Sequence, residues 1–106
     1  MIPDHTRGHC SDDRLALLWT VHQHAAWPAE IGPHEGELMM IDTVITGCLT
    51  YYFEEVDGLD TQRIDILRDS LTQLEDLLPE IPDTALEYFS RTRDLATLLL
   101  NRHSLS

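Results

Sequence analysis

Residues 33–58 read PHEGELMMIDTVITGCLTYYFEEVDG, and this stretch decides the fold. Pro33 suits the first turn of a helix, where its missing N–H has no partner to lose, and Gly58 is typical of the left-handed residue that follows a helix end. Apolar residues recur at helical spacing between them: Leu38, Ile41, Ile45, Cys48, Leu49, Tyr52 and Val56. The pattern predicts a long helix from Pro33 to about Asp57, with this stripe against the core.

A second apolar stripe adjoins the first on the same helix and comprises Met40, Val44, Gly47 and Tyr51. Together the two stripes span about 200°, whereas a surface helix needs an apolar arc of only roughly 100°. The helix is therefore expected to be buried on more than one side. Either it is the most enclosed helix of its own bundle, or the second stripe meets another polypeptide, in which case a self-complementary two-fold dimer is expected.

Two further helices flank this one in the chain. Ser11 can cap a helix that ends before Pro28. Its apolar face comprises Leu15, Leu18, Trp19, His22 and Ala26. After Gly58, Asp60 can cap the next helix. Its apolar residues alternate in steps of three and four: Ile64, Leu67, Leu71, Leu74 and Leu78. That spacing is typical of helices that pack at shallow crossing angles.

A last helix follows Pro79 and Pro82, and Thr84 and Glu87 have the spacing of a capping box at its start. Its apolar side extends to about Arg102 and comprises Ala85, Tyr88, Phe89, Leu95, Ala96, Leu99 and Leu100. No segment alternates with the period of a strand, and the connections are short. We therefore predict an all-α fold, an antiparallel up-and-down four-helix bundle with short loops, as one domain over residues 11–103 after a loose, flexible N-terminal tail over residues 1–10.

The charge balance narrows the choice of partners. The 106 residues include 19 acidic and 7 basic side chains, and every basic one is arginine, for a net charge of −12. Such a surface repels nucleic acid phosphates and anionic lipids, so we expect no direct nucleic-acid or membrane binding. Cys10 and Cys48 lie in unlike settings, which favours a reducing cytoplasm over a disulfide framework. No apolar run is long enough to span a bilayer.

Residues 22–37, HQHAAWPAEIGPHEGE, hold three histidines and three glutamates. A zinc site needs three or four converging ligands, but His22 and His24 are two positions apart on a helix and point in nearly opposite directions. We therefore interpret this stretch as a polar corner between helices and assign no metal ligand. The alternative is a small-ligand or metal pocket at the corner, lined by Trp19, His22, Trp27, His34 and Glu35.

No catalytic constellation is complete. Cys48 lies on the stripe expected to be buried, and the Glu-x-x-His spacing of di-iron bundles is missing. The acidic group Glu54, Glu55 and Asp57 leaves a magnesium-dependent enzyme as an alternative. The sequence favours a non-enzymatic protein that binds other proteins without a cofactor: an adaptor, a chaperone-like helper or an inhibitor. We expect a homodimer through the second stripe, with an acidic immunity-type or nucleic-acid-mimicking inhibitor of a basic protein as a further alternative.

Overall fold

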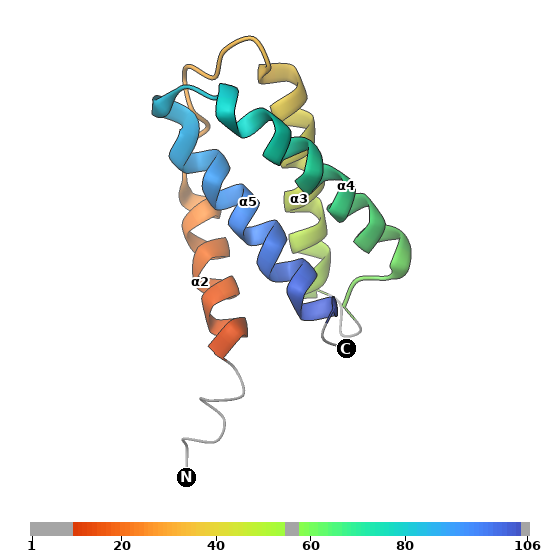
Figure 1. The fold of residues 1–106 in the computed structure, drawn as a ribbon. Coiled ribbons are helices and arrows are strands. Elements are labelled where there is room, and N and C mark those ends of the chain that lie inside the picture. The colour runs from red at the N-terminus through yellow and green to blue at the C-terminus, as the bar shows by residue number, and fades with distance from the viewer. Residues whose placement is uncertain (1–9, 55–57, 105–106) are drawn as a thin grey trace.

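The computed structural model describes residues 10–54 and 58–104, which hold four α-helices and one short 3-10 helix. These elements are α2 (Cys10–His24), α3 (Glu35–Glu54), α4 (Thr61–Leu77), η1 (Leu78–Glu80) and α5 (Asp83–Ser104). The chain runs alternately up and down along the four helices, and no strand lies in the described ranges (Figure 1). The predicted all-α four-helix bundle is confirmed. Residues 1–9 of the tail expected over residues 1–10 lie outside the described part of the chain, and residue 10 begins α2.

The core lies where α3, α4 and α5 meet, and α2 packs against α5. Most residues of the apolar faces predicted from the sequence are buried or half-buried, whereas Ala26 is exposed. The buried set includes Leu15 of α2; Leu38, Ile41, Ile45, Cys48 and Leu49 of α3; Leu67 and Leu74 of α4; and Ala85, Phe89, Leu95, Ala96 and Leu99 of α5. Among the helices of the described part, none is long and apolar enough to cross a membrane.

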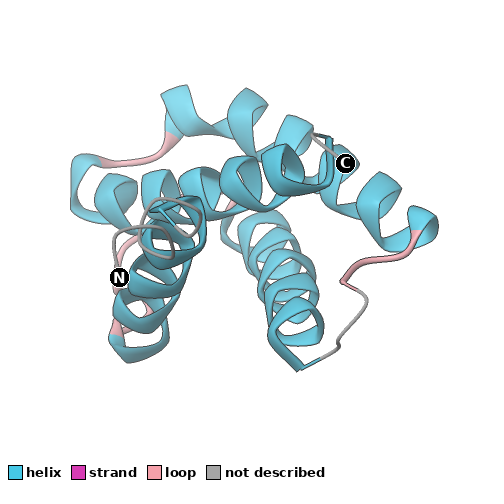
Figure 2. Ribbon diagram, turned by 90° about the horizontal axis from the view of Figure 1, so that it is seen from below, coloured by secondary structure: helices cyan, strands magenta, loops and turns pink. Residues whose placement is uncertain are grey.

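The helices α2 and α3 stand apart although they follow each other in the chain. In Figure 2 the helix beside the N mark and the helix that leads into the grey segment of residues 55–57 diverge beneath α5. Two side-chain contacts bridge them. The rings of Trp19 and Phe53 stack with centroids 6.4 Å apart, and His22 Nε2 lies 3.2 Å from Asp42 Oδ1. The second contact becomes important below.

The first helix ends earlier than predicted. It begins at Cys10, so Ser11 lies inside it rather than at its cap, and it ends at His24 rather than near Pro28. The chain leaves the helix because Trp27 and Ile31 turn into the core: Trp27 packs edge-on against Phe89 at 5.5 Å, and Ile31 is buried. A continued helix would direct these side chains away from the core.

The long helix begins at Glu35 rather than at Pro33. Gly32 has a positive φ of 101°, and its carbonyl accepts a hydrogen bond from the Glu35 N–H at 3.3 Å, so Pro33 lies in a turn before the helix. At the other end, Gly58 has the positive φ of 77° that favours glycine. The predicted helix end at Val56 and Asp57 falls outside the described residues.

One predicted cap is confirmed and one is wrong. Asp60 caps α4, since its Oδ1 accepts a hydrogen bond from the Arg63 N–H at 2.8 Å. The capping box of Thr84 and Glu87 does not form. The last helix begins one residue earlier, at Asp83, and the Thr84 hydroxyl donates instead to the Glu30 carbonyl at 3.3 Å. Thr84 thereby ties the α2–α3 connection to the start of α5.

Candidate functional site

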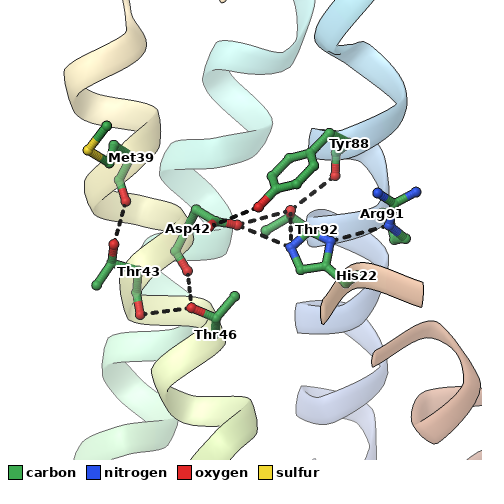
Figure 3. Close-up of polar contacts among 8 residues, drawn as sticks. All are labelled: His22, Met39, Asp42, Thr43, Thr46, Tyr88, Arg91 and Thr92. Atoms are coloured by element: carbon green, nitrogen blue, oxygen red, sulfur yellow. Dashed lines mark hydrogen bonds and ion pairs between the residues drawn. The ribbon is translucent and has the colours of Figure 1, made fainter. Parts of the chain in front are cut away.

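A polar cluster joins three helices inside the bundle (Figure 3). It consists of His22 from α2, Asp42 from α3, and Tyr88, Arg91 and Thr92 from α5. His22 Nε2 faces Asp42 Oδ1 at 3.2 Å and the Thr92 hydroxyl at 3.3 Å. The Tyr88 hydroxyl donates to Asp42 Oδ2 at 3.2 Å. Both ring nitrogens of His22, both carboxylate oxygens of Asp42 and the hydroxyls of Tyr88 and Thr92 therefore have partners within the cluster, as buried polar groups require.

The neighbours of His22 assign its tautomer. An arginine always carries its Nε–H, and Arg91 donates that hydrogen to His22 Nδ1 at 3.2 Å. Nδ1 is thus an acceptor, and the ring carries its hydrogen on Nε2, where it faces the Asp42 carboxylate. The histidine bridges the arginine and the carboxylate in a fixed orientation.

Tyr88 serves the cluster as a hydroxyl donor. Burial and the nearby negative charge of Asp42 raise its pKa far above the usual value, and the hydrogen bond to that carboxylate acts in the same direction. The ring of Tyr88 also lies 4.5 Å from the ring of His22 and 5.5 Å from that of Trp27. The phenol therefore holds its proton and fills the space between α2 and α5.

The centre of the cluster, at His22 and Thr92, is buried, which limits its chemistry. His22 is 4% exposed and Thr92 is fully buried, so the Thr92 hydroxyl lies out of reach of a substrate. The one proton of this hydroxyl is directed at the Tyr88 carbonyl or at Asp42, at 3.1 and 3.4 Å. The arrangement can hold α2, α3 and α5 in register, because a shift of any helix would leave buried polar groups without partners.

Sequence reasoning identified His22 on the apolar face of its helix but missed its partners. Asp42 is a charged residue of the long helix, yet only 13% of its side chain is exposed. One signal was present in the sequence: Thr92 lies between Phe89 and Ala96 on the apolar side of the last helix. A lone hydroxyl in such a stripe needs a polar partner from another helix.

The five residues proposed as a corner pocket meet in pairs. Trp19 stacks on His22 at 6.5 Å as well as on Phe53 at 6.4 Å, and His22 belongs to the buried cluster. The Trp27 indole N–H donates to Glu35 Oε2 at 3.5 Å, at the other end of the corner. Groups of three or more potential metal ligands are missing from the described residues.

His34 lies apart from the other corner residues and joins the start of α3 to the end of η1. Its Nδ1 lies 3.0 Å from Glu37 Oε1 and its Nε2 lies 2.8 Å from Glu80 Oε1. Hydrogen bonds to these two carboxylates, first from Glu37 and then from Glu80, raise the pKa of His34 above its ordinary value. When protonated, His34 therefore forms a charged link between two corners of the bundle.

The stripe proposed as an interface lies on the outward side of α3, and its members are exposed to different degrees. Met40 is 70% exposed and Gly47 is exposed, whereas Val44 and Tyr51 are half-buried. The Arg63 guanidinium lies 3.8 Å from the centroid of the Tyr51 ring. The stripe thus begins as free surface at Met40 and ends against the first turn of α4.

The outward side of α3 carries no charge between Leu38 and Phe53. We call this surface the neutral face; its exposed members are Met39, Met40, Thr43, Gly47, Thr50 and Phe53. The threonine hydroxyls at its edge are satisfied inside the helix: Thr43 donates to the Met39 carbonyl and Thr46 to the Asp42 carbonyl, each at 2.8 Å (Figure 3). Burying the neutral face would therefore strand neither a charge nor these hydroxyl donors.

Gly47 occupies the middle of the neutral face. A Cβ built at this position meets nothing within 4 Å, so its own chain leaves room for a side chain. Glycine inside a helix costs about 0.5–1 kcal/mol relative to alanine. No contact among the described residues requires a glycine at position 47, so packing within this part of the chain does not explain the cost.

Cys48 lies beside Gly47 but faces inward. Burial raises the pKa of its thiol, which lies 3.9 Å from the Arg63 carbonyl oxygen, and the side chain is a free cysteine. A thiol kept protonated and enclosed is a poor nucleophile. Of the acidic group Glu54, Glu55 and Asp57, only Glu54 lies among the described residues.

Comparison with known proteins adds no relative to these observations. The chain matches no protein-family model, no curated protein and no solved structure.

Proposed function

We propose that this protein acts by binding another polypeptide through the neutral face of α3, and that it forms a homodimer. One observation carries the proposal: in a chain with a net charge of −12, the exposed side of α3 between Leu38 and Phe53 carries no charge. Interface cores are depleted in charged residues and enriched in methionine and aromatic side chains. Met39, Met40 and Phe53 supply both kinds.

The buried cluster supports a role in surfaces rather than in chemistry. His22, Asp42 and Thr92 use their hydrogen-bonding capacity on one another and on α5, which fixes the position of α3 relative to the rest of the bundle. A rigidly held helix loses little freedom when a partner docks on it. A free thiol at Cys48 is compatible with the reducing cytoplasm that we propose as the compartment.

Sedimentation equilibrium at micromolar concentration tests the proposal. We expect the wild type to be dimeric and Met40→Glu to be monomeric, because a buried glutamate would need a partner that the neutral face does not offer. Leu17→Glu is the matched control: Leu17 of α2 is 68% exposed, close to the 70% of Met40, but it lies on another helix. This variant should remain dimeric. A monomeric wild type would refute the homodimer.

A second candidate rests on the outward side of α4. Four acidic residues are exposed there, Asp65, Asp69, Glu75 and Asp76, and Arg68 pairs with the first of them at 3.3 Å. A basic protein is the partner that such a surface would attract. Its complex would weaken steeply as salt is raised, whereas a dimer through the neutral face would not. Titration with sodium chloride therefore separates the two modes.

A further inference from the structure

An outward seam follows the neutral face along the middle of α3. Its residues recur in steps of three and four, and every one is exposed: Met40, Thr43, Gly47 and Thr50. This spacing keeps one line of a helix in contact with a second helix. The seam lies on a different side of α3 from the residues that pack in the core, such as Ile41 and Ile45. One helix therefore carries two lines of residues suited to contact with other helices.

The middle of the seam is built from small residues. Thr43 and Thr50 lie on either side of Gly47, where an added Cβ would meet open space. Small side chains let two helix backbones approach closely, with axes about 8 Å apart at the crossing point. A close approach from outside would account for Gly47, which no contact among the described residues explains.

The charges of the molecule indicate what covers this seam. Two copies with a net charge of −12 each repel one another, so a contact between copies must fall where charge is lowest. Between Leu38 and Phe53 the one charged side chain is Asp42, which faces His22 and Tyr88 rather than solvent. A basic partner would gain nothing from this surface, whereas a second neutral face fits it.

We propose that two copies of the chain pair through α3, with the helices crossing in close backbone contact at Gly47. This inference rests on the proposed function and specifies its geometry. A two-fold axis beside Gly47 places this residue against its own copy, as an isologous interface requires. Ile66 of α4 is 42% exposed and lies one turn after Arg63, which covers Tyr51, so it can extend the contact at the flank.

Substitution of Gly47 separates folding from association. Gly47→Ala removes the glycine cost and has room in the isolated chain, so the thermal midpoint of the monomer should rise. The same methyl group would obstruct the crossing and weaken dimerisation by about tenfold, and Gly47→Leu by about a hundredfold, the size of steric clashes in a packed contact. Sedimentation equilibrium measures the dissociation constants of the dimers. Thermal denaturation of samples dilute enough to be monomeric measures the midpoints.

Gly36→Ala is the matched control. It makes the same change at the other open glycine of α3, 11 residues and about 16 Å from Gly47, where crossed helices have diverged. Its dissociation constant should stay within about twofold of the wild type. If Gly47→Ala and Gly47→Leu dimerise like the wild type while Met40→Glu does not, the crossing at Gly47 is wrong and the proposed function stands. If the wild type is monomeric, both fail.

A cysteine at the crossing gives a direct readout. In a Cys10→Ser background, Gly47→Cys should form a disulfide between copies on air oxidation, because a disulfide needs Cα atoms closer than about 7 Å. Gly36→Cys should remain unlinked. Linkage through position 36 and not through position 47 would overturn the crossing point.

Discussion

The helices α3 and α4 are neighbours in the chain, have similar lengths of 20 and 17 residues, and pack on each other, but they present opposite surfaces to solvent. The outward side of α4 is charged, with Asp65, Asp69 and Asp76 among its exposed residues. The neutral face of α3 carries no charged residue. Both helices bury leucines completely, Leu49 in α3 and Leu67 in α4. Core packing therefore does not dictate the outer surface, and the neutrality of α3 needs an explanation outside the monomer.

The largest expected loss of stability comes from removing Asp42, the acidic residue of α3 that faces the buried cluster, and is compared with the removal of an exposed acidic residue of α4. Asp42→Ala leaves His22 and Tyr88 without their carboxylate acceptor, and we expect the free energy of unfolding to fall by about 3–5 kcal/mol. Asp69→Ala removes an exposed carboxylate and should change it by less than about 0.5 kcal/mol. Urea denaturation measures both. Equal effects would show that the buried cluster does not hold the helices together.

The next test asks whether the two helices are equivalent inside the bundle. Leu49→Ala and Leu67→Ala each delete a fully buried side chain, and each should lower the free energy of unfolding by about 2–5 kcal/mol through lost burial and a residual cavity. Similar values would confine the difference between the helices to their outer sides. A loss below 1 kcal/mol for Leu49→Ala alone would instead place α3 at the margin of the core.

A smaller effect is expected where α4 begins. Asp60→Ala removes the side chain that accepts from the Arg63 N–H and pairs with the Arg63 guanidinium at 2.9 Å, and should cost about 1 kcal/mol. Asp60→Asn keeps a capping oxygen and loses the ion pair, so it should cost clearly less. If both variants lose the same amount of stability in denaturation curves, the ion pair rather than the cap accounts for the loss.

The smallest effect concerns His34, where the start of α3 meets the end of η1. Because the folded state raises the pKa of His34, the stabilisation is fully present below the ordinary value of 6.5 and disappears as pH rises through the raised pKa. The wild type should therefore be more stable than His34→Ala near pH 6, and the difference should shrink toward pH 9. Thermal midpoints of the two proteins across this range provide the measurement. A difference that is constant with pH would exclude a charged link.

Much of the fold could be predicted because helix faces follow from spacing alone. The 3-4 steps of Leu67 and Leu74 place both on one side of α4, and Asp60 is a cap whatever the neighbouring helices do. Predictions that depended on other segments were wrong. Thr84 has the spacing of a cap, but Glu30 offers its hydroxyl a carbonyl from another part of the chain.

The exposure of the proposed interface stripe could be read from the sequence only in part. The order of residues in one helix grouped Met40 and Gly47, which are exposed, with Val44 and Tyr51, which are half-buried. The buried cluster draws His22, Asp42 and Thr92 from three helices, and their distances depend on how α2 lies across α5. Periodicity assigns each of these residues to a face of its own helix, but it does not say which residue of another helix lies opposite.

The separation of α2 from α3 has a consequence for the order in which the molecule opens. Since α2 packs on α5 and reaches α3 through the His22–Asp42 bond and the Trp19–Phe53 stack, it can detach while α3, α4 and α5 keep their mutual contacts. Local opening of this kind exposes backbone amides before the whole domain unfolds. Amide protons of α2 would then exchange with deuterated water ahead of those of α3, and a three-helix remnant would outlast the first helix on the way to the unfolded chain.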